Sequence, residues 1–327
     1  MIKLVVDMMG SDGGSATTVQ AVIDFLKEND DTEFFCVGNI NELNRLKDNN
    51  RVHLIASKGI IPMEAGALEA LRARDSSMMV AIDTLMNERA DGIISAGGTG
   101  AYLSSTTIKL KKIEGVSRPA LVSPFPTKIK GKQVVVLDIG ASNENSSLEL
   151  VQFALMGRLY AQNVLGVNDP KVFLLSNGTE SGKGSPIVKE AHSLLKNDKY
   201  FKGNIEGREA LYGDADVIVC DGFTGNVFLK TCEGVAKMMS GMMKDAFRRN
   251  IFSKCGYLLA KKGFNEMKET MDYKATGGAM ILGVNGVVVK AHGSSDAFAF
   301  KCALNVAYKL AKNDITKKIR EGIVQNA

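Results

Sequence analysis

Two segments of the chain place a polar side chain among glycines directly after a short apolar run. Lys183 lies within Ser176–Ser185, which reads SNGTESGKGS, and Asn226 ends the segment Cys220–Asn226, which reads CDGFTGN. A glycine-bearing turn between a strand and a helix can point backbone N–H groups at a ligand, and the helix dipole there favours negative charge. Both segments are therefore candidate anion sites. Ordinary strand-to-helix turns of many α/β folds have the same appearance, so that reading stays open.

The segment around Lys183 has only a superficial similarity to a nucleotide-binding P-loop. Three residues separate Gly178 from Gly182, and Gly184 follows the lysine where a P-loop has Ser or Thr. We therefore reject nucleotide binding by this segment. A third segment, 290–296 with the sequence KAHGSSD, also follows a β-branched run and precedes a helix. It contains His292, which could transfer a proton near neutral pH or could be a satisfied structural histidine.

Further polar residues and glycines near these junctions form a second group of candidates. Aspartates and serines at such positions either contact a ligand, orient a neighbouring side chain or cap a helix. Glycines allow close backbone approach to a ligand, although turn geometry alone also explains them. The candidate ligand-binding residues are Gly97, Gly98, Gly100, Asp138, Gly182, Gly184, Asp221, Gly225, Ser294 and Asp296.

The elements that would position these residues follow an alternating α/β pattern. Short apolar runs alternate with helical stretches, which predicts a mostly parallel sheet within one integrated domain, 1–327. Three prolines in 119–126 disfavour regular pairing, so this segment is predicted to be a hinge between lobes. The predicted strands are 2–6, 33–38, 52–55, 92–95, 133–139, 171–175 and 216–220, with a further β-branched run at 287–289.

The segment 224–272 departs from this alternation and predicts a helical appendage. Its apolar residues recur every three or four positions, as in an amphipathic helix, and include Val235, Met238, Met239, Met242 and Met243. We expect this methionine stripe to pack in the core. Further along, basic residues flank a short apolar patch, as in helices that lie on a membrane surface. The candidate membrane-contact residues are Ile251, Phe252, Leu258 and Leu259.

Composition excludes several classes of protein. The chain has 327 residues, enough for a sizeable core, and its net charge of +5 is spread among many acids, which does not favour nucleic-acid binding. Five cysteines without a CxxC pair are typical of reduced cysteines in a cytoplasmic protein. We expect no secretion signal, no membrane-spanning segment, no metal and no cofactor, because the apolar runs are short and the three histidines are scattered.

Taken in order, the motifs resemble the PlsX family of bacterial phosphate acyltransferases along nearly the whole chain. The matching motifs are CDGFTGN, the GKGS loop and KAHGSSD, with VDMMGSD at 6–12, RDSSMMVA at 74–81, SAGGTGA at 95–101, RPAL at 118–121, LDIGA at 137–141, QFALMG at 152–157 and NIEGRE at 204–209. The resemblance implies transfer of a fatty acyl group from acyl carrier protein to inorganic phosphate. The product would be an acyl phosphate for phospholipid (phosphatidic acid) synthesis.

The resemblance also implies a structure and a setting. It implies a three-layer α/β/α fold related to the isocitrate and isopropylmalate dehydrogenases, and a homodimer in the cytoplasm that associates peripherally with the membrane. The appendage 224–272 would serve dimerisation and membrane contact. Implied partners are the acidic acyl carrier protein, whose charge is opposite to the chain's +5, and a downstream glycerol-3-phosphate acyltransferase.

Lys183 and Asn226 match the catalytic lysine and asparagine positions of that family. A cation and a neutral donor suit an attack by phosphate on a thioester carbonyl, with lysine binding phosphate and asparagine polarising the carbonyl. Direct attack within a ternary complex is the simplest mechanism, and His292 could protonate the departing thiolate or bind phosphate. The chain departs from the family pattern at Gly13, where a histidine commonly follows the aspartate, at Gly98 and at 142–144.

Three other functions remain as alternatives. A phosphate acetyl- or butyryltransferase would use coenzyme A for the same chemistry, but the long apolar appendage disfavours it. A metal- and NAD-dependent decarboxylating dehydrogenase would need a dinucleotide fingerprint and an acidic metal cluster, and the sequence has neither in convincing form. A noncatalytic membrane scaffold would not need the intact loops of Lys183 and Asn226.

Overall fold

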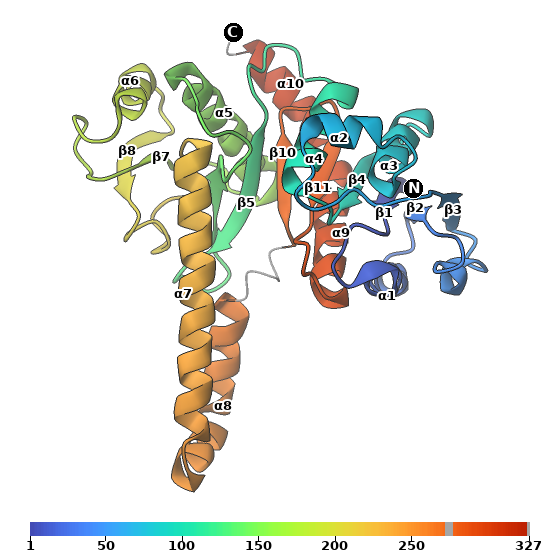
Figure 1. Cartoon of the computed structure of the whole chain (residues 1–327). Helices are drawn as coiled ribbons and strands as arrows, with labels where there is room; N and C mark the ends of the chain where they lie inside the picture. Colours follow the sequence, from blue (N-terminus) through green and yellow to red (C-terminus); the bar gives the residue numbers. More distant parts are fainter. Residues whose placement is uncertain (272–276, 326–327) are drawn as a thin grey trace.

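The computed structural model describes residues 1–271 and 277–325, with the side chains of 265–271 left out, so Asp272 at the end of the predicted appendage lies outside it. Within these residues the chain forms an 11-stranded sheet (Figure 1). Its order is β3 (Val52–Ala56), β2 (Thr32–Gly38), β1 (Ile2–Asp7), β4 (Gly92–Ser95), β11 (Val287–Lys290), β10 (Ala279–Leu282), β5 (Ala120–Pro126), β6 (Gln133–Leu137), β9 (Val217–Val219), β7 (Val172–Ser176) and β8 (Phe201–Glu206).

Two groups of parallel strands flank an antiparallel central pair. The strands from β3 to β11 are parallel to one another, and so are the strands from β6 to β8. Because β10 and β5 are each antiparallel to both neighbours, the two groups run in opposite directions. One row across the sheet aligns Val289, Met280, Val122 and Leu137. The carboxyl ends of β11 and β6 therefore lie close to the same row, on either side of the central pair.

Helices cover both faces of the sheet. Alternate residues of the central strands belong to two separate cores, as with Val135 and Val136, which explains why the strand sequences are continuously apolar. One face carries α1 (Gly14–Glu28), η1 (Asn44–Leu46), α5 (Ser147–Val164), α6 (Pro186–Leu195), α9 (Ala297–Lys312) and α10 (Ile315–Gln325), and the other carries α2 (Ala67–Arg72), α3 (Ser77–Asn87) and α4 (Thr99–Leu110). The predicted α/β/α layering is confirmed.

The strand predictions are confirmed except around the central pair and at one edge. The eight apolar runs all form strands, but β8 and β10 were not predicted, and 119–126 is not a hinge because 120–126 forms β5. In β5 the N–H groups of Leu121 and Thr127 point towards β6, so those of the even-numbered residues point towards β10. Among the described residues, pairing with β10 stops at Val122, so Pro124 and Pro126 lie beyond the end of this pairing, where their missing N–H groups cost no hydrogen bond to β10.

A helical hairpin projects from the body of the molecule (Figure 1). It consists of α7 (Gly222–Arg248) and α8 (Ile251–Met271), which pack through Phe247 against Phe264, with ring centroids 4.6 Å apart. No helix in the described parts of the chain is long and apolar enough to cross a membrane. The expectation of core packing for the methionine stripe is wrong, because Met238 and Met242 are 55% and 62% exposed in the single chain.

We predict that Gly225→Ala destabilises the protein by about 1–3 kcal/mol, because a Cβ at Gly225 would overlap the carbonyl oxygen of Asp138. The matched control is Gly234→Ala in the same helix, where a Cβ meets open space and should stabilise by about 0.5–1 kcal/mol. Denaturant unfolding of both variants measures the difference. Equal stabilities of the two variants would contradict the close contact between α7 and the loop after β6.

Candidate active site

The loop that follows β6 is organised by the buried carboxylate of Asp138. One of its oxygens accepts hydrogen bonds from the N–H groups of Leu121, Gly140 and Ala141, at 2.8–3.1 Å. The other accepts from the N–H and the hydroxyl of Ser142, at 3.0 and 2.8 Å. Burial raises the pKa of Asp138, and these hydrogen bonds act in the opposite direction. Asp138, a predicted ligand-binding residue, is 0% exposed and shapes the loop from inside.

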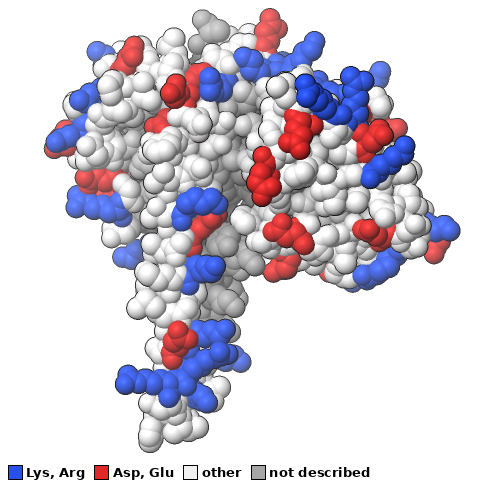
Figure 2. Space-filling view, in the orientation of Figure 1, with Lys and Arg blue, Asp and Glu red and all other residues white. Residues whose placement is uncertain are grey.

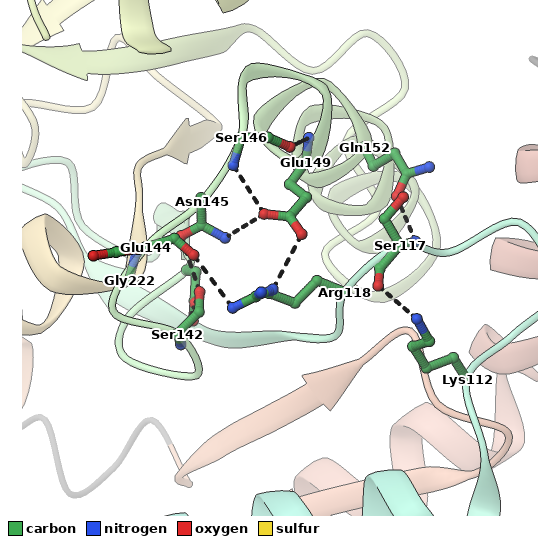
Figure 3. A network of polar contacts seen from close by, with 11 residues as sticks. Lys112, Ser117, Arg118, Ser142, Glu144, Asn145, Ser146, Glu149, Gln152 and Gly222 are labelled. Carbon is green, nitrogen blue, oxygen red and sulfur yellow. Dashed lines mark hydrogen bonds and ion pairs between the residues drawn. The ribbon is translucent and has the colours of Figure 1, made fainter. Parts of the chain in front are cut away.

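A polar network connects this loop to the starts of α5 and α7 (Figure 3). The side-chain oxygen of Asn145 accepts hydrogen bonds from Ser142 Oγ at 2.9 Å and from the N–H of Gly222 at 3.1 Å. The amide of Asn145 donates to Glu149 at 3.2 Å, and Arg118 donates to the other carboxylate oxygen of Glu149 at 3.1 Å. The first turn of α7 is thereby fixed relative to β5 and β6.

The first turn of α7 carries Asn226 and is capped by Asp221. The carboxylate of Asp221 accepts hydrogen bonds from the N–H and the hydroxyl of Thr224, at 2.8 and 2.7 Å, which satisfies the start of the helix. Gly222 and Gly225 are buried against the loop after β6. Asn226 lies beside Gly140, where an added Cβ would come within 3.3 Å of the asparagine side chain.

A cavity of about 570 Å³, which we call the polar cavity because charged and polar side chains lie in its wall, is found where the loops after β1, β4, β6 and β11 meet α7. Its lining brings together predicted site residues from segments far apart in the sequence, and these are Gly97, Gly98, Asn226, His292 and Ser294. Asp12, Lys230, Glu233 and Lys290 also line it. Of the predicted residues, Gly100 lies in the first turn of α4 and does not line this cavity, and Asp296 caps α9 by accepting a hydrogen bond from the N–H of Ala299.

His292 is a neutral hydrogen-bond donor in this arrangement. Burial lowers the pKa of His292 below its ordinary value of 6.5, with Lys290 and Lys230 adding to the effect and Glu233 and Asp12 opposing it. The N–H of Ser294 donates to Nδ1 of the ring at 3.2 Å. In the neutral ring the proton is therefore on Nε2. This proton is available to a ligand in the polar cavity.

The pattern of the sequence did not single out Lys290. It ends β11 at 8% exposure, and its ammonium donates to the carbonyl oxygens of Ala96 and Ala291. Burial lowers the pKa of Lys290 to about 8. In the sequence, Lys290 directly follows the β-branched run Val287–Val289. A lysine at this position is typical of an ordinary strand end, so the sequence alone did not indicate that it is buried.

A larger, apolar cavity of about 1030 Å³ lies on the other side of α7. It is lined by α7 residues such as Val227, Phe228 and Cys232, and by residues from β5, β7 and the β7–α6 loop. Phe125, Pro126, Leu229 and Glu233 line both cavities, which shows that the two adjoin. The site therefore offers a polar compartment next to an apolar one, with α7 between them.

The loop that carries Lys183 borders the apolar cavity. Gly184 and Ser185 line this cavity opposite Thr224 and Val227 of α7, while Lys183 itself is exposed to solvent. The N–H of Gly184 donates to the side chain of Asn177 at 2.9 Å, and Gly184 has a φ of 103°, a conformation that favours glycine. The loop of Lys183 and the first turns of α7 thus both line the apolar cavity, but Lys183 itself lines neither cavity, whereas Asn226 lines the polar one.

The described residues contain no group of three or more His, Cys, Asp or Glu side chains placed to hold a metal ion. The side chains of the site include a buried ammonium, a neutral imidazole and a carboxamide in one cavity, and an exposed lysine on a loop that borders the adjoining cavity. Such donors suit an anionic ligand and a carbonyl oxygen that gains negative charge during a reaction.

Comparison with known proteins defines the family. Residues 2–318 match the family described as "Fatty acid synthesis protein", and the chain belongs to this family. It is 41% identical to the phosphate acyltransferase of Exiguobacterium sp. over 98% of each chain. It is 39% identical to the phosphate acyltransferase of Nitratiruptor sp., covering 98% of this chain and 97% of the relative.

Solved structures with a similar fold include enzymes of two kinds. A phosphotransacetylase from Streptococcus pyogenes aligns with a TM-score of 0.60 and 16% identity, over 96% of this chain and 94% of that one. A 4-hydroxythreonine-4-phosphate dehydrogenase from Klebsiella pneumoniae aligns with a TM-score of 0.53 and 11% identity, over 95% of this chain and 99% of that one. These likenesses confirm the expected fold group.

We predict that Asn145→Ala lowers the free energy of unfolding by about 1–3 kcal/mol, because the buried N–H of Gly222 loses its acceptor. Asn163→Ala is the matched control, since Asn163 is also half-buried but donates only within α5, to the carbonyl of Leu159. Its effect should stay within about 0.5 kcal/mol. Chemical denaturation measures both, and a loss no larger than that of the control would show that the network does not hold α7.

Proposed function

We propose that the protein transfers a fatty acyl group from acyl carrier protein to inorganic phosphate, forming an acyl phosphate for phospholipid synthesis. The observation that carries the proposal is the apolar cavity of about 1030 Å³ that adjoins the polar cavity containing Asn226 and His292. An acyl chain needs an apolar compartment, and phosphate needs donors and positive charge next to it. The phosphate acyltransferase relatives support the same reaction.

The proposed mechanism is a direct attack of a phosphate oxygen on the thioester carbonyl. The attack forms the bond between a phosphate oxygen and the carbonyl carbon, the bond between that carbon and sulfur breaks, and the proton of the attacking hydrogen phosphate passes to the departing thiolate. Lys183 supplies positive charge for the phosphate dianion, and the carboxamide N–H of Asn226 stabilises the carbonyl oxygen as it becomes negative. The Nε2–H of neutral His292 donates a hydrogen bond to the phosphate or to the departing sulfur. The glycines around these residues allow the backbone to approach the ligands closely.

The test of this function is a substrate comparison. Purified protein is incubated with phosphate and either long-chain acyl-acyl carrier protein or acetyl-coenzyme A, and the acyl phosphate is detected. We expect the long-chain substrate to be preferred, because each buried methylene contributes about 0.8 kcal/mol in an apolar compartment. A preference for acetyl-coenzyme A would instead favour the phosphotransacetylase reaction, the chemistry named for a protein of similar fold.

We further propose that the protein is a homodimer and a peripheral membrane protein through its hairpin. The methionine stripe leaves Val235, Met238, Met239 and Met242 exposed on α7, an apolar surface typical of an interaction site. Near the free end of the hairpin, Phe252 and Leu259 are 83% and 91% exposed. Figure 2 shows basic side chains gathered just above the free end of the hairpin. The basic residues of this part of the sequence are Arg248, Arg249, Lys254, Lys261 and Lys262. Apolar residues among basic ones suit the surface of an anionic membrane.

We predict that Lys183→Ala and Asn226→Ala each lower the turnover number by roughly a hundredfold to a thousandfold. Loss of a donor that acts on charge developing in the transition state commonly raises the barrier by about 2.7–4 kcal/mol. Lys189→Ala, an exposed lysine on the neighbouring helix α6, is the matched control and should retain activity. The measurement is acyl phosphate formation at saturating phosphate. Near-parental turnover of a folded variant would show that the substituted residue has no catalytic role.

We predict that Leu258→Glu with Leu259→Glu weakens binding to anionic phospholipid vesicles. Burial of two leucines in the membrane surface contributes at most about 3–6 kcal/mol, and two added carboxylates are repelled by the lipid. Vesicle flotation measures the effect, with circular dichroism and light scattering to check the fold and the dimer. Leu68→Glu with Leu194→Glu is the control, since these exposed leucines lie on the body of the protein. Unchanged flotation of a folded dimer would show that the hairpin end is not the main membrane contact.

A further inference from the structure

Lys290 is a buried cation that the assignments of Lys183, Asn226 and His292 leave without a function. It is 8% exposed and lines the polar cavity at the end of β11. Among the described residues, its hydrogen-bond partners are the neutral carbonyl groups of Ala96 and Ala291. The carboxylates of Asp7 and Asp12 act on it through space. In the described part of the chain no carboxylate is hydrogen-bonded to this ammonium, so a bound anion in the cavity would complete its surroundings.

A chain of hydrogen bonds holds the carbonyl groups around Lys290 in place. Asp7 is 1% exposed, and its carboxylate accepts a hydrogen bond from Ser95 Oγ at 2.6 Å. Ser95 Oγ in turn accepts from the N–H of Gly97 at 3.0 Å. The end of β1 therefore fixes the loop after β4, which carries the carbonyl of Ala96. The position of the Lys290 ammonium is set by three neighbouring strands, β1, β4 and β11.

The first turn of α4 adds a second feature that favours an anion. Gly98 and Thr99 line the polar cavity. Gly98 is at the N-cap position and, as a glycine, has no side chain that could cap the first N–H groups of the helix. These N–H groups are the positive end of the helix dipole. The buried ammonium and the uncapped helix start line the same cavity of about 570 Å³.

We propose that Lys290 binds the phosphate dianion in the polar cavity, together with the N–H groups at the start of α4. This inference rests on the proposed acyl transfer to phosphate and names a further residue for it. Lys290 then holds the nucleophile from the inner side of the cavity. Asn226 and His292, which line the same cavity, are placed to act on the carbonyl and the departing sulfur.

The response of stability to phosphate separates this role from a purely structural one. Lys290→Met leaves the carbonyl groups of Ala96 and Ala291 without their donor and the buried carboxylate of Asp7 without a neighbouring cation, so the variant should melt at a lower temperature under either role. If Lys290 binds phosphate, added phosphate should raise the melting temperature of the parental protein more than that of the variant, and an equal rise in both would contradict the role.

The kinetic test compares Lys290→Met with Lys230→Met, which replaces another lysine that lines the cavity. Lys230 is 58% exposed and is already paired with Glu233 at 2.9 Å. We expect Lys290→Met to raise the KM for phosphate by about tenfold or more, with the KM for acyl-acyl carrier protein changed less than threefold, because a hydrogen-bonded charge is lost. Equal effects of the two variants on the KM for phosphate would overturn the assignment.

The pH dependence gives an independent readout. The pKa of Lys290 is lowered to about 8 by burial and by Lys230, with Asp7 and Asp12 opposing, and His292 is a further titratable neighbour. Because only the charged form attracts phosphate, kcat/KM for phosphate should fall as the pH rises through about 8. This alkaline limb should be absent in Lys290→Met and should move to higher pH in Lys290→Arg, since arginine stays charged.

Direct binding distinguishes failure of this inference from failure of the proposed reaction. Calorimetric titration of the protein with inorganic phosphate, without any acyl donor, should show binding that is about tenfold weaker in Lys290→Met. Unchanged phosphate affinity in a folded Lys290→Met protein would overturn the role of Lys290, even if acyl phosphate is formed. Weakened phosphate binding without acyl phosphate formation would support Lys290 and contradict the proposed reaction instead.

Discussion

The close packing of the first turn of α7 on the loop after β6 is the contact on which the rest of the site depends. It requires Gly222 and Gly225, because a side chain at either position would overlap backbone atoms of that loop. The loop itself takes its shape from the buried carboxylate of Asp138. Since α7 continues outward from this turn, one contact sets both the place of Asn226 and the direction of the whole hairpin (Figure 1).

The two buried charged groups of the site, Asp138 and Lys290, differ in how completely the protein satisfies them. Asp138 is surrounded by N–H and O–H donors from its own loop, so its carboxylate is satisfied by the protein alone. Lys290 has two carbonyl acceptors and more distant carboxylates. A fully satisfied charge stabilises a loop, whereas an incompletely satisfied one lowers stability and suits a ligand of opposite charge. Asp138 therefore shapes the site, whereas Lys290 is the residue that we propose binds the ligand.

Helix α7 joins the two proposed activities of the protein. Its first turns separate the polar cavity from the apolar one, and Val235 and Ala236 further along also line the apolar cavity. The same helix then leads to the exposed apolar residues at the end of the hairpin. The proposed membrane-contact residues lie just beyond its end, in α8.

The sequence by itself determined the local structure and the order of the motifs. Continuous apolar runs predicted the parallel strands, because strands buried on both faces have no polar side, and the glycine-rich turns marked the starts of α6 and α7. Only the tertiary structure decided that 120–126 is β5, one strand of the central pair, because its prolines are tolerated where the pairing with β10 ends. It likewise decided that Lys290 is buried in a cavity and that the methionine stripe is exposed. Burial and pairing depend on neighbours that are distant in the chain, and no local pattern of residues contains that information.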